Sequence, residues 1–448
     1  MNRRWYYLGL GIIAASILFH QPLLIVIGLL VLVVLCTTDI WSTYCLRQLC
    51  YSRQLSEQRA LFGEQVTLSL AVENAKLLPL PWLEVEDTIP RALTMSGQRL
   101  RVSIIGDTAI LDNLFSTRWY ERVTRRYIVQ CNARGVHKFG PTVVRSGDVF
   151  GFLTAEETFS NWEYLLVYPL VAPLTRFNLP ARHPFGDRRA PRRLLEDPLR
   201  VIGVRDYAYG DSLRRVHWKA TARTMQMQSK VYEATTTYTL VIFLNVVTQL
   251  DSRHGLQPEV QELAICAAAS VADWALNEGY AVGLHANTLM YMPEEKVQTK
   301  QESGEEEGLD VTLAGQLKRR RIHLPAATSE EQRKRIMEVL ARIQPYFGST
   351  LEDVIQTERS RLPAGATVVV ITSAVTDVLL DTLVRMKQAG HTVAILFVGD
   401  TPSPARLAGL TVYHLGGRDT WQNLVAAYGN TAEMPALPEY GAPAGFRL

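Results

Sequence analysis

Cysteine pairs, basic runs and enzyme signatures are all missing from this sequence of 448 residues. The five cysteines are scattered, and none belongs to a Cys-x-x-Cys pair; they are Cys36, Cys45, Cys50, Cys131 and Cys266. This argues against a disulfide framework and against a zinc site built from thiolates, and it fits a reducing compartment. The formal net charge is only +3, so nucleic-acid binding has no electrostatic support.

Known catalytic motifs are absent as well. The sequence contains no Gly-x-Ser-x-Gly elbow, no Walker A loop and no His-Glu-x-x-His helix. The pair Gly9 and Gly11 lies inside an apolar stretch and does not form a dinucleotide-binding loop. We therefore expect a protein that is not an enzyme and that carries no cofactor.

Two apolar stretches open the chain. They run from Trp5 to Phe19 and from Leu23 to about Trp41, and Pro22 lies at the break between them. Each stretch is near the lower end of the roughly 17–25 residues that span a bilayer as a helix. Proline interrupts the helical hydrogen bonds at the place where a turn is required. The sequence thus predicts a helical hairpin of two transmembrane spans within residues 1–41.

The basic residues beside these stretches predict their orientation. Arg3 and Arg4 precede the first stretch, Arg47, Arg53 and Arg59 follow the second, and the turn carries no Lys or Arg. By the positive-inside rule, both ends of the hairpin face the cytoplasm. A cleaved signal peptide is the main alternative, but no small-residue cleavage site follows the first stretch. A second alternative is a single bent span, which would export the C-terminus. We expect a multi-pass protein of the bacterial inner membrane with cytoplasmic soluble domains.

Residues 42–170 have the pattern of β-structure. Polar and apolar side chains alternate in three segments, and a fourth is continuously apolar; these are Gln65–Val72, Trp82–Glu86, Arg125–Gln130 and Glu163–Tyr168. Alternation is the period of a half-buried strand, and turn residues separate the segments. Several short strands at this spacing predict an antiparallel β-sandwich-like domain.

The remainder of the chain divides into three parts. Residues 171–235 begin as a linker rich in Pro and Arg and end in a charged motif. From 236 to 430, buried strands near 238–244, 280–285, 366–371 and 392–398 alternate with helices near 259–276 and 376–388. This alternation predicts a doubly wound α/β domain with helices on both faces of a parallel sheet. Residues 431–448 form a C-terminal tail.

The charged motif lies between residues 205 and 223. It places cations, a tyrosine, a Gly-Asp pair and a Trp-Lys pair at fixed spacings: Arg205, Tyr207, Gly210, Asp211, Arg214, Trp218, Lys219, Ala222 and Arg223. The motif resembles the signature of the domain-of-unknown-function family DUF 58, with Val216 in place of the usual isoleucine. Two upstream segments, 134–141 and 148–153, also resemble that family.

The resemblance implies a C-terminal fold similar to a von Willebrand factor A domain. It also implies association with a MoxR-type AAA+ ATPase in the assembly or maturation of envelope or other client proteins. The family has no settled biochemical activity. We expect a membrane-anchored, non-catalytic interaction protein that contacts the lipid bilayer, the ATPase and client proteins. The alternative is an enzyme or binding protein that uses the basic signature on an acidic or phosphorylated ligand.

The chemistry of the signature favours a structural role. Asp211 can pair with neighbouring guanidinium groups, and Gly210 can adopt a positive φ just before it. A tryptophan within a charged stretch is expected to be buried, so Trp218 is predicted at the junction of the β domain and the α/β domain. The cluster would then hold the two domains together. The other interpretation is a surface for a partner or a phosphate, formed by Arg214, Arg215, Lys219 and Arg223.

Von Willebrand A domains commonly bind Mg²⁺ through an Asp-x-Ser-x-Ser motif after the first strand. The matching positions here are Asn245, Val247 and Gln249, which offer one neutral carbonyl and no carboxylate or hydroxyl. Because Mg²⁺ prefers hard oxygen ligands such as carboxylates, we expect this position not to bind a metal.

Overall fold

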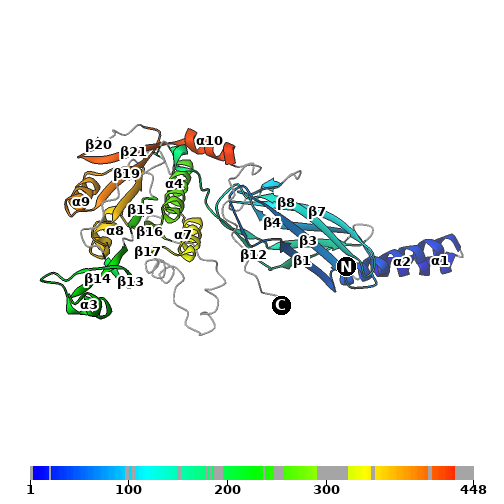
Figure 1. The fold of residues 1–448 in the computed structure, drawn as a ribbon. Helices are drawn as coiled ribbons and strands as arrows, with labels where there is room; N and C mark the ends of the chain where they lie inside the picture. Colours follow the sequence, from blue (N-terminus) through cyan, green and yellow to red (C-terminus); the bar gives the residue numbers. More distant parts are fainter. Residues whose placement is uncertain are drawn as a thin grey trace, which may run out of the picture. The chain divides into compact units, whose positions relative to one another are not determined.

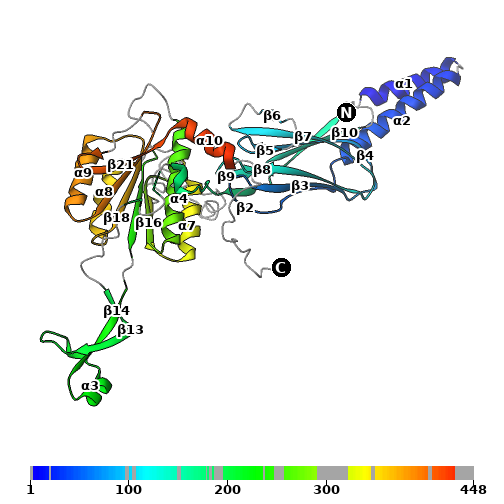
Figure 2. The ribbon, with the colours of Figure 1, turned by 45° about the horizontal axis from the view of Figure 1, so that its top comes forward.

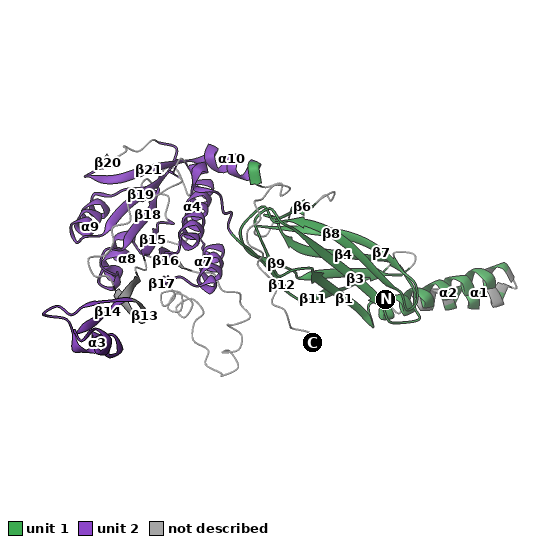
Figure 3. Cartoon of the chain, in the orientation of Figure 1, with its two compact units in different colours: residues 1–168, 427–448 green, residues 169–426 purple. Residues whose placement is uncertain are grey.

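The computed structural model describes residues 4–19, 22–95, 100–102, 107–148, 153–177, 179–180, 184–185, 195–235, 238–246, 257–289, 321–344, 349–401 and 406–428. The chain forms two compact units, which comprise residues 1–168 with 427–448 and residues 169–426 (Figure 3). All five cysteines are free.

Two apolar helices begin the first unit, α1 (Arg4–Phe19) and α2 (Pro22–Tyr44). The 23 residues of α2 extend about 35 Å at 1.5 Å per residue, enough for a hydrocarbon layer of about 30 Å. The 16 residues of α1 extend only about 24 Å. Among the described residues, one helix is therefore long and apolar enough to cross a membrane, over Ile25–Tyr44. The two-span hairpin remains a prediction, and its turn at 20–21 lies outside the described residues.

The C-terminal end of α2 and the residue after it pack against the β domain. The indole N–H of Trp41 donates to the carbonyl of Pro79 at 3.1 Å, and Thr38 and Cys45 are buried. The helix therefore continues to Tyr44, beyond the predicted end near Trp41, because packing on the strands stabilises it.

Antiparallel strands make up most of the first unit (Figure 1). One sheet has the order β1-β3-β8-β5, a second β11-β10-β4-β7-β6, and a third β2-β12-β9. The strands are β1 (Leu49–Leu55), β2 (Arg59–Ala60), β3 (Gln65–Asn74), β4 (Leu80–Pro90), β5 (Thr94–Met95), β6 (Arg101–Val102), β7 (Thr108–Thr117), β8 (Arg122–Gln130), β9 (Gly135–Phe139), β10 (Thr142–Gly147), β11 (Thr154–Phe159) and β12 (Glu163–Val167). Only β2 and β12 pair in parallel among the described strands of this unit.

The period-two pattern places alternate residues of β3 and β4 in one shared core. Leu68 and Leu70 of β3 and Leu83 and Val85 of β4 are fully buried there. Each sheet thus supplies one apolar face, as the alternation predicts.

A buried ion pair crosses this core. The guanidinium of Arg53 pairs with the carboxylate of Asp87, and both side chains are almost completely removed from water. Asp87 also accepts hydrogen bonds from Tyr51 Oη at 2.9 Å and Thr142 Oγ1 at 2.8 Å, while Arg53 Nη2 donates to the carbonyl of Phe139 at 2.9 Å. These bonds compensate the two charges for their lost hydration.

The second unit is built on a seven-stranded sheet with the order β17-β16-β15-β18-β19-β21-β20. Its five central strands are parallel, and an antiparallel strand lies at each edge. The strands are β15 (Thr239–Leu244), β16 (Ala281–Leu289), β17 (Arg321–Ala327), β18 (Thr367–Thr372), β19 (Thr392–Val398), β20 (Arg406–Leu407) and β21 (Leu410–Gly416). The helices are α4 (Pro258–Asn277), α7 (Glu330–Arg342), α8 (Leu351–Glu358), α9 (Asp377–Gln388) and α10 (Arg418–Tyr428).

Helices cover both faces of this sheet (Figures 1 and 2). Val241 and Phe243 of β15 share a core with Ile355 of α8 and Leu383 of α9. Ile242 points to the opposite face by alternation, on the side of α4. A mixed α/β architecture with several sheets is thereby confirmed, whereas the likeness to a von Willebrand A domain remains a prediction.

Side-chain caps and a glycine define the ends of two helices in this unit. Ser329 caps α7 by accepting a hydrogen bond from the Gln332 backbone N–H at 3.1 Å. The side-chain amide of Gln332 instead donates to the carbonyls of Val282 and Pro325. Helix α9 begins after Thr376, which caps it, and Gly390 just beyond its end has φ +96°.

Candidate functional site

The signature residues lie in a β-hairpin of the second unit. Strands β13 (Leu195–Asp206) and β14 (Gln228–Thr235) pair antiparallel, and Tyr207 N–H donates to the carbonyl of Met227 at 2.9 Å where they separate. The short helices η2 (Leu213–Arg215) and α3 (Trp218–Thr224) occupy the connection. We call residues 203–231 the signature hairpin.

Four signature residues build a tight turn at the start of this connection. Gly210 adopts φ +105°, a conformation that suits glycine, and thereby directs Asp211 back towards the strand. The carboxylate of Asp211 pairs with Arg205 Nη2 at 2.7 Å and accepts from the Ala208 N–H at 3.1 Å. Tyr207 Oη donates to the carbonyl of Asp211 at 2.7 Å. The backbone N–H of Ala208 and then the Arg205 guanidinium lower the pKa of Asp211.

Helix α3 is held on β14 by backbone-directed bonds. His217 Nδ1 accepts from the Ala220 N–H at 3.0 Å and so caps the helix, while the His217 N–H donates to the carbonyl of Gln228 at 2.7 Å. The Gln228 N–H in turn donates to Thr221 Oγ1 at 3.0 Å. Met225 ends the helix in the left-handed conformation. His217 is therefore a capping residue in a rigid turn.

Four of the five remaining signature residues have large side chains, and these point into solvent. Arg214, Trp218, Lys219 and Arg223 are all exposed, and Trp218 leaves 68% of its surface accessible. The prediction that Trp218 is buried is wrong. Alternation puts it beside Val216, which is 2% exposed, but the chain changes from extended to helical at His217. Trp218 becomes the first residue of α3, and Val216 alone takes the buried position.

The ion pair that the sequence predicted as a clamp between domains is local. It joins Arg205 to Asp211, six residues further on, and closes the turn of the hairpin. The first part of the signature, Arg205 to Asp211, therefore fixes the turn, and the second part, Arg214 to Arg223, exposes four large side chains to solvent. Among the residues that the structure describes, none forms an ion pair with Arg214, Lys219 or Arg223.

Exposed apolar side chains concentrate on the signature hairpin. Of the seven large apolar residues that are exposed in the described part of the second unit, six lie here and only Val378 lies elsewhere; the six are Val204, Tyr209, Leu213, Trp218, Met225 and Met227. Six cations and two anions accompany them, which gives the hairpin a net charge of +4. Large apolar groups left in water beside cations are typical of an interaction surface.

The position of the degenerate metal motif is filled by neutral groups. Asn245, just beyond β15, donates from Nδ2 to Thr372 Oγ1 at 3.0 Å and accepts on Oδ1 from Asn287 Nδ2 at 2.8 Å. Asn287 Oδ1 accepts from the Val246 N–H at 2.9 Å. This network lies where ligands bind in doubly wound sheets, between the first strand and the strand that reverses the order. Val247 and Gln249 lie outside the described residues.

A further group of polar residues gave no signal in the sequence. His285 of β16, His323 of β17 and Glu358 of α8 converge, although long stretches of chain separate them. Burial, and then the neighbouring His323, lower the pKa of His285 to about 4, so this imidazole is neutral at pH 7. The only local hint was His285 itself, which follows the apolar run 280–284.

Comparison with known proteins supports one family assignment for part of the chain. A curated relative, the uncharacterized protein YeaD of Bacillus subtilis (strain 168), is 24% identical over 245 residues, which cover 54% of this chain and 57% of the relative. The matching part thus spans little more than half of that relative's length.

Solved structures add no argument about the fold. A CARDB domain from Pyrococcus furiosus, crystallised with di-metal ions, is 12% identical with a TM-score of 0.19, and covers 27% of this chain and 86% of that chain. A cohesin module from a Clostridium perfringens family 33 glycoside hydrolase is 9% identical with a TM-score of 0.18, over 26% of this chain and 96% of that chain.

Residues 203–303, which begin with the signature hairpin, match the family described as protein of unknown function DUF58.

Proposed function

We propose that this protein is a membrane-anchored, non-catalytic interaction protein whose signature hairpin binds a protein partner. The observation that carries the proposal is the concentration of exposed apolar side chains on the hairpin, six of the seven in the described second unit. The turn around Asp211 and the cap on α3 hold this surface in one conformation, which lowers the entropy lost on binding.

The composition of the hairpin fits a protein partner better than a small ligand. Tryptophan, tyrosine, methionine and arginine are enriched at protein interfaces, and tryptophan and arginine dominate the residues that contribute most binding energy. Trp218 lies next in sequence to Lys219, and Arg214 precedes it by four residues. The net charge of +4 favours a partner with an acidic face, and the association should weaken as salt screens it.

The partner that we propose is a MoxR-type AAA+ ATPase, as the resemblance to DUF 58 proteins implies. The two proteins would act in the assembly or maturation of envelope or other client proteins. The second unit, a doubly wound sheet that we take to be a von Willebrand A-like domain, would present the hairpin.

The membrane anchor completes the proposal. Helix α2 has the length and composition of a span, and we propose that α1 crosses the bilayer with it as a short hairpin. Arginines on both outer flanks favour a cytoplasmic location for the soluble units in a bacterial inner membrane. In this proposed topology the signature hairpin would face the compartment that supplies ATP to the proposed partner.

Binding of the full chain, held in lipid nanodiscs, to the MoxR-type ATPase of the same organism tests the proposal. Trp218→Ala should weaken binding at least tenfold, and Arg214→Ala with Lys219→Ala should weaken it most at low salt. Trp119→Ala is the matched control, because Trp119 is 62% exposed on the first unit and should leave affinity unchanged.

Two other results would contradict it. If neither hairpin variant weakens binding, the hairpin is not the docking surface. If the cationic variant abolishes binding of a phosphorylated or acidic ligand while Trp218→Ala has no effect, the alternative function, a site for anionic ligands, would replace the proposal.

A further inference from the structure

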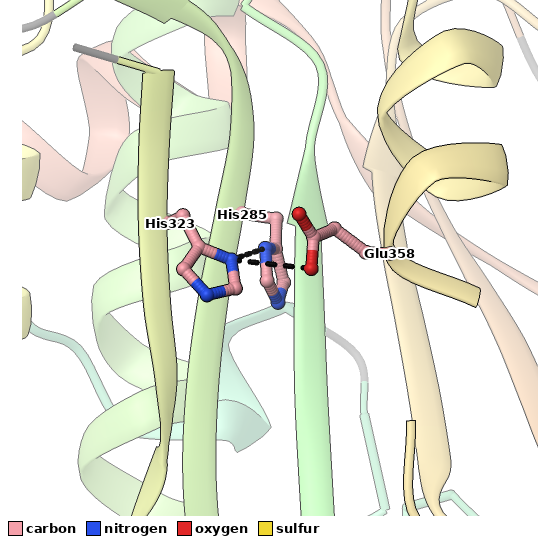
Figure 4. A group of neighbouring side chains, drawn as sticks. All are labelled: His285, His323 and Glu358. Carbon is pink, nitrogen blue, oxygen red and sulfur yellow. Dashed lines mark hydrogen bonds and ion pairs between the residues drawn. The ribbon is translucent and has the colours of Figure 1, made fainter. Parts of the chain in front are cut away.

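Three potential metal ligands meet inside the second unit, away from the signature hairpin. His285 and His323 are directly opposite each other in the antiparallel pair β16–β17, and Glu358 is the last residue of α8 (Figure 4). His285 is 4% exposed and Glu358 is 8% exposed, whereas the side chain of His323 is 39% exposed. The group is therefore walled by protein on one side and open at His323.

The distances bring lone pairs together. The Nδ1 atoms of the two histidines are 3.2 Å apart, and His323 Nδ1 is 3.3 Å from Glu358 Oε2. Figure 4 shows the rings and the carboxylate turned towards one another. His323 Nδ1 can direct a single proton to only one of these neighbours at a time. A cation at the centre would satisfy all three atoms at once.

These separations suit a tetrahedral ion. Ligand atoms about 2.1 Å from Zn²⁺ lie about 3.4 Å from each other at tetrahedral angles. The two separations that include His323 have this length, and the three ligand atoms all lie within 4.8 Å of one another. Rotation of the Glu358 side chain would close the remaining, wider edge. Two imidazoles and one carboxylate form a ligand set that zinc sites use, with water in the fourth position.

Neighbouring groups hold the ligands in place. The ring of His285 stacks on Phe243, with the ring centroids 5.0 Å apart. Arg361 Nη1 contacts both oxygens of Glu358, Oε1 at 3.2 Å and Oε2 at 3.4 Å, and Oε2 also faces His323 Nδ1. Such outer contacts orient the first ligands of metal sites and increase their affinity.

We propose that His285, His323 and Glu358 bind one Zn²⁺ ion, with water as the fourth ligand on the open side. This site is distinct from the degenerate motif at Asn245, and it departs from the expectation, drawn from the sequence, that the chain carries no metal. The ion would tie the edge strand β17 to β16 and α8.

Titration calorimetry of the full-length protein in detergent, purified without a histidine tag and stripped with chelator, tests this site. One Zn²⁺ per chain should bind with micromolar or tighter affinity. Co²⁺ should give the intense visible absorption of a tetrahedral site. His323→Ala and Glu358→Gln should each weaken Zn²⁺ binding at least tenfold. His323 is partly exposed, so its variant should fold.

His414→Ala is the matched control. His414 lies on β21, where it stacks on Phe397 and its Nε2 hydrogen-bonds with the carbonyl oxygen of Gly399, and no ring contact or hydrogen bond joins it to a second histidine of the described residues. This variant should bind Zn²⁺ like the wild type. The proposal is overturned if no stoichiometric ion binds, or if His323→Ala and Glu358→Gln bind Zn²⁺ as tightly as the control.

Discussion

Replacement of Trp218 by alanine should cost little stability. About a third of this residue is removed from water, which is about 80 Å² of the roughly 250 Å² that a tryptophan can bury. At about 25 cal/mol per Å² this burial contributes at most about 2 kcal/mol. Alanine retains the Cβ contacts and has a higher helix propensity by about 0.5 kcal/mol, so the net loss should be about 1 kcal/mol.

The matched comparison is an aromatic residue in the core of the same unit. Phe243 is completely buried, and Phe243→Ala should cost about 3–5 kcal/mol. The contrast between the two variants therefore measures exposure directly, and both changes remove one aromatic ring.

Hydrogen exchange is the suitable assay because the chain has two units, and a single unfolding midpoint would mix them. Amides of β15 report the opening of the second unit, and amides of β13 and β14 report the hairpin alone. Trp218→Ala should change protection by less than about tenfold in both, since tenfold corresponds to about 1.4 kcal/mol. A loss of a hundredfold or more would show that the ring is packed, and the binding surface would have to be abandoned.

Further predictions concern charge, metal and topology. Asp87→Ala should lower the opening free energy measured by hydrogen exchange at β3 by about 3–5 kcal/mol, because it leaves Arg53 buried without its partner. Asp112→Ala, which removes an exposed carboxylate, should lower it by less than about 1 kcal/mol. Equal losses would show that the buried ion pair is no more important than the exposed one. Calorimetry with Mg²⁺ should detect no micromolar site. A stoichiometric Mg²⁺ site that disappears in Asn245→Ala would contradict the prediction that the degenerate motif binds no metal. A periplasm-active reporter fused after Leu448 should stay silent, whereas strong activity would exclude cytoplasmic domains.

Regular periodicity explains how much of the fold could be predicted. The alternation around 65–72 became β3, and the apolar run at 238–244 became β15. The helix predicted over 259–276 is α4, within one residue at each end. Each of these elements buries a full face, so its apolar residues recur with a regular period that can be recognised in the sequence.

Elements with little buried surface were missed for the same reason. Strand β17 lies at the edge of its sheet, and its polar–apolar alternation ends at Pro325 after four residues, too few to predict a strand. The signature hairpin combines strand and helix within a few residues. Burial of Trp218 was expected from the size of its apolar surface, but α3 leaves the ring exposed. The three proposed zinc ligands come from separate elements, and only the tertiary fold brings them together.

Contact between the hairpin and its partner is the most direct test of the central claim. A photocrosslinking amino acid at position 218 of the full chain, in cells that contain the MoxR-type ATPase, should form adducts with the ATPase. The same amino acid at position 119, where the natural tryptophan is similarly exposed at 62%, should form none. The absence of adducts from position 218, or equal yields from both positions, would contradict the assignment of the signature hairpin as the docking surface.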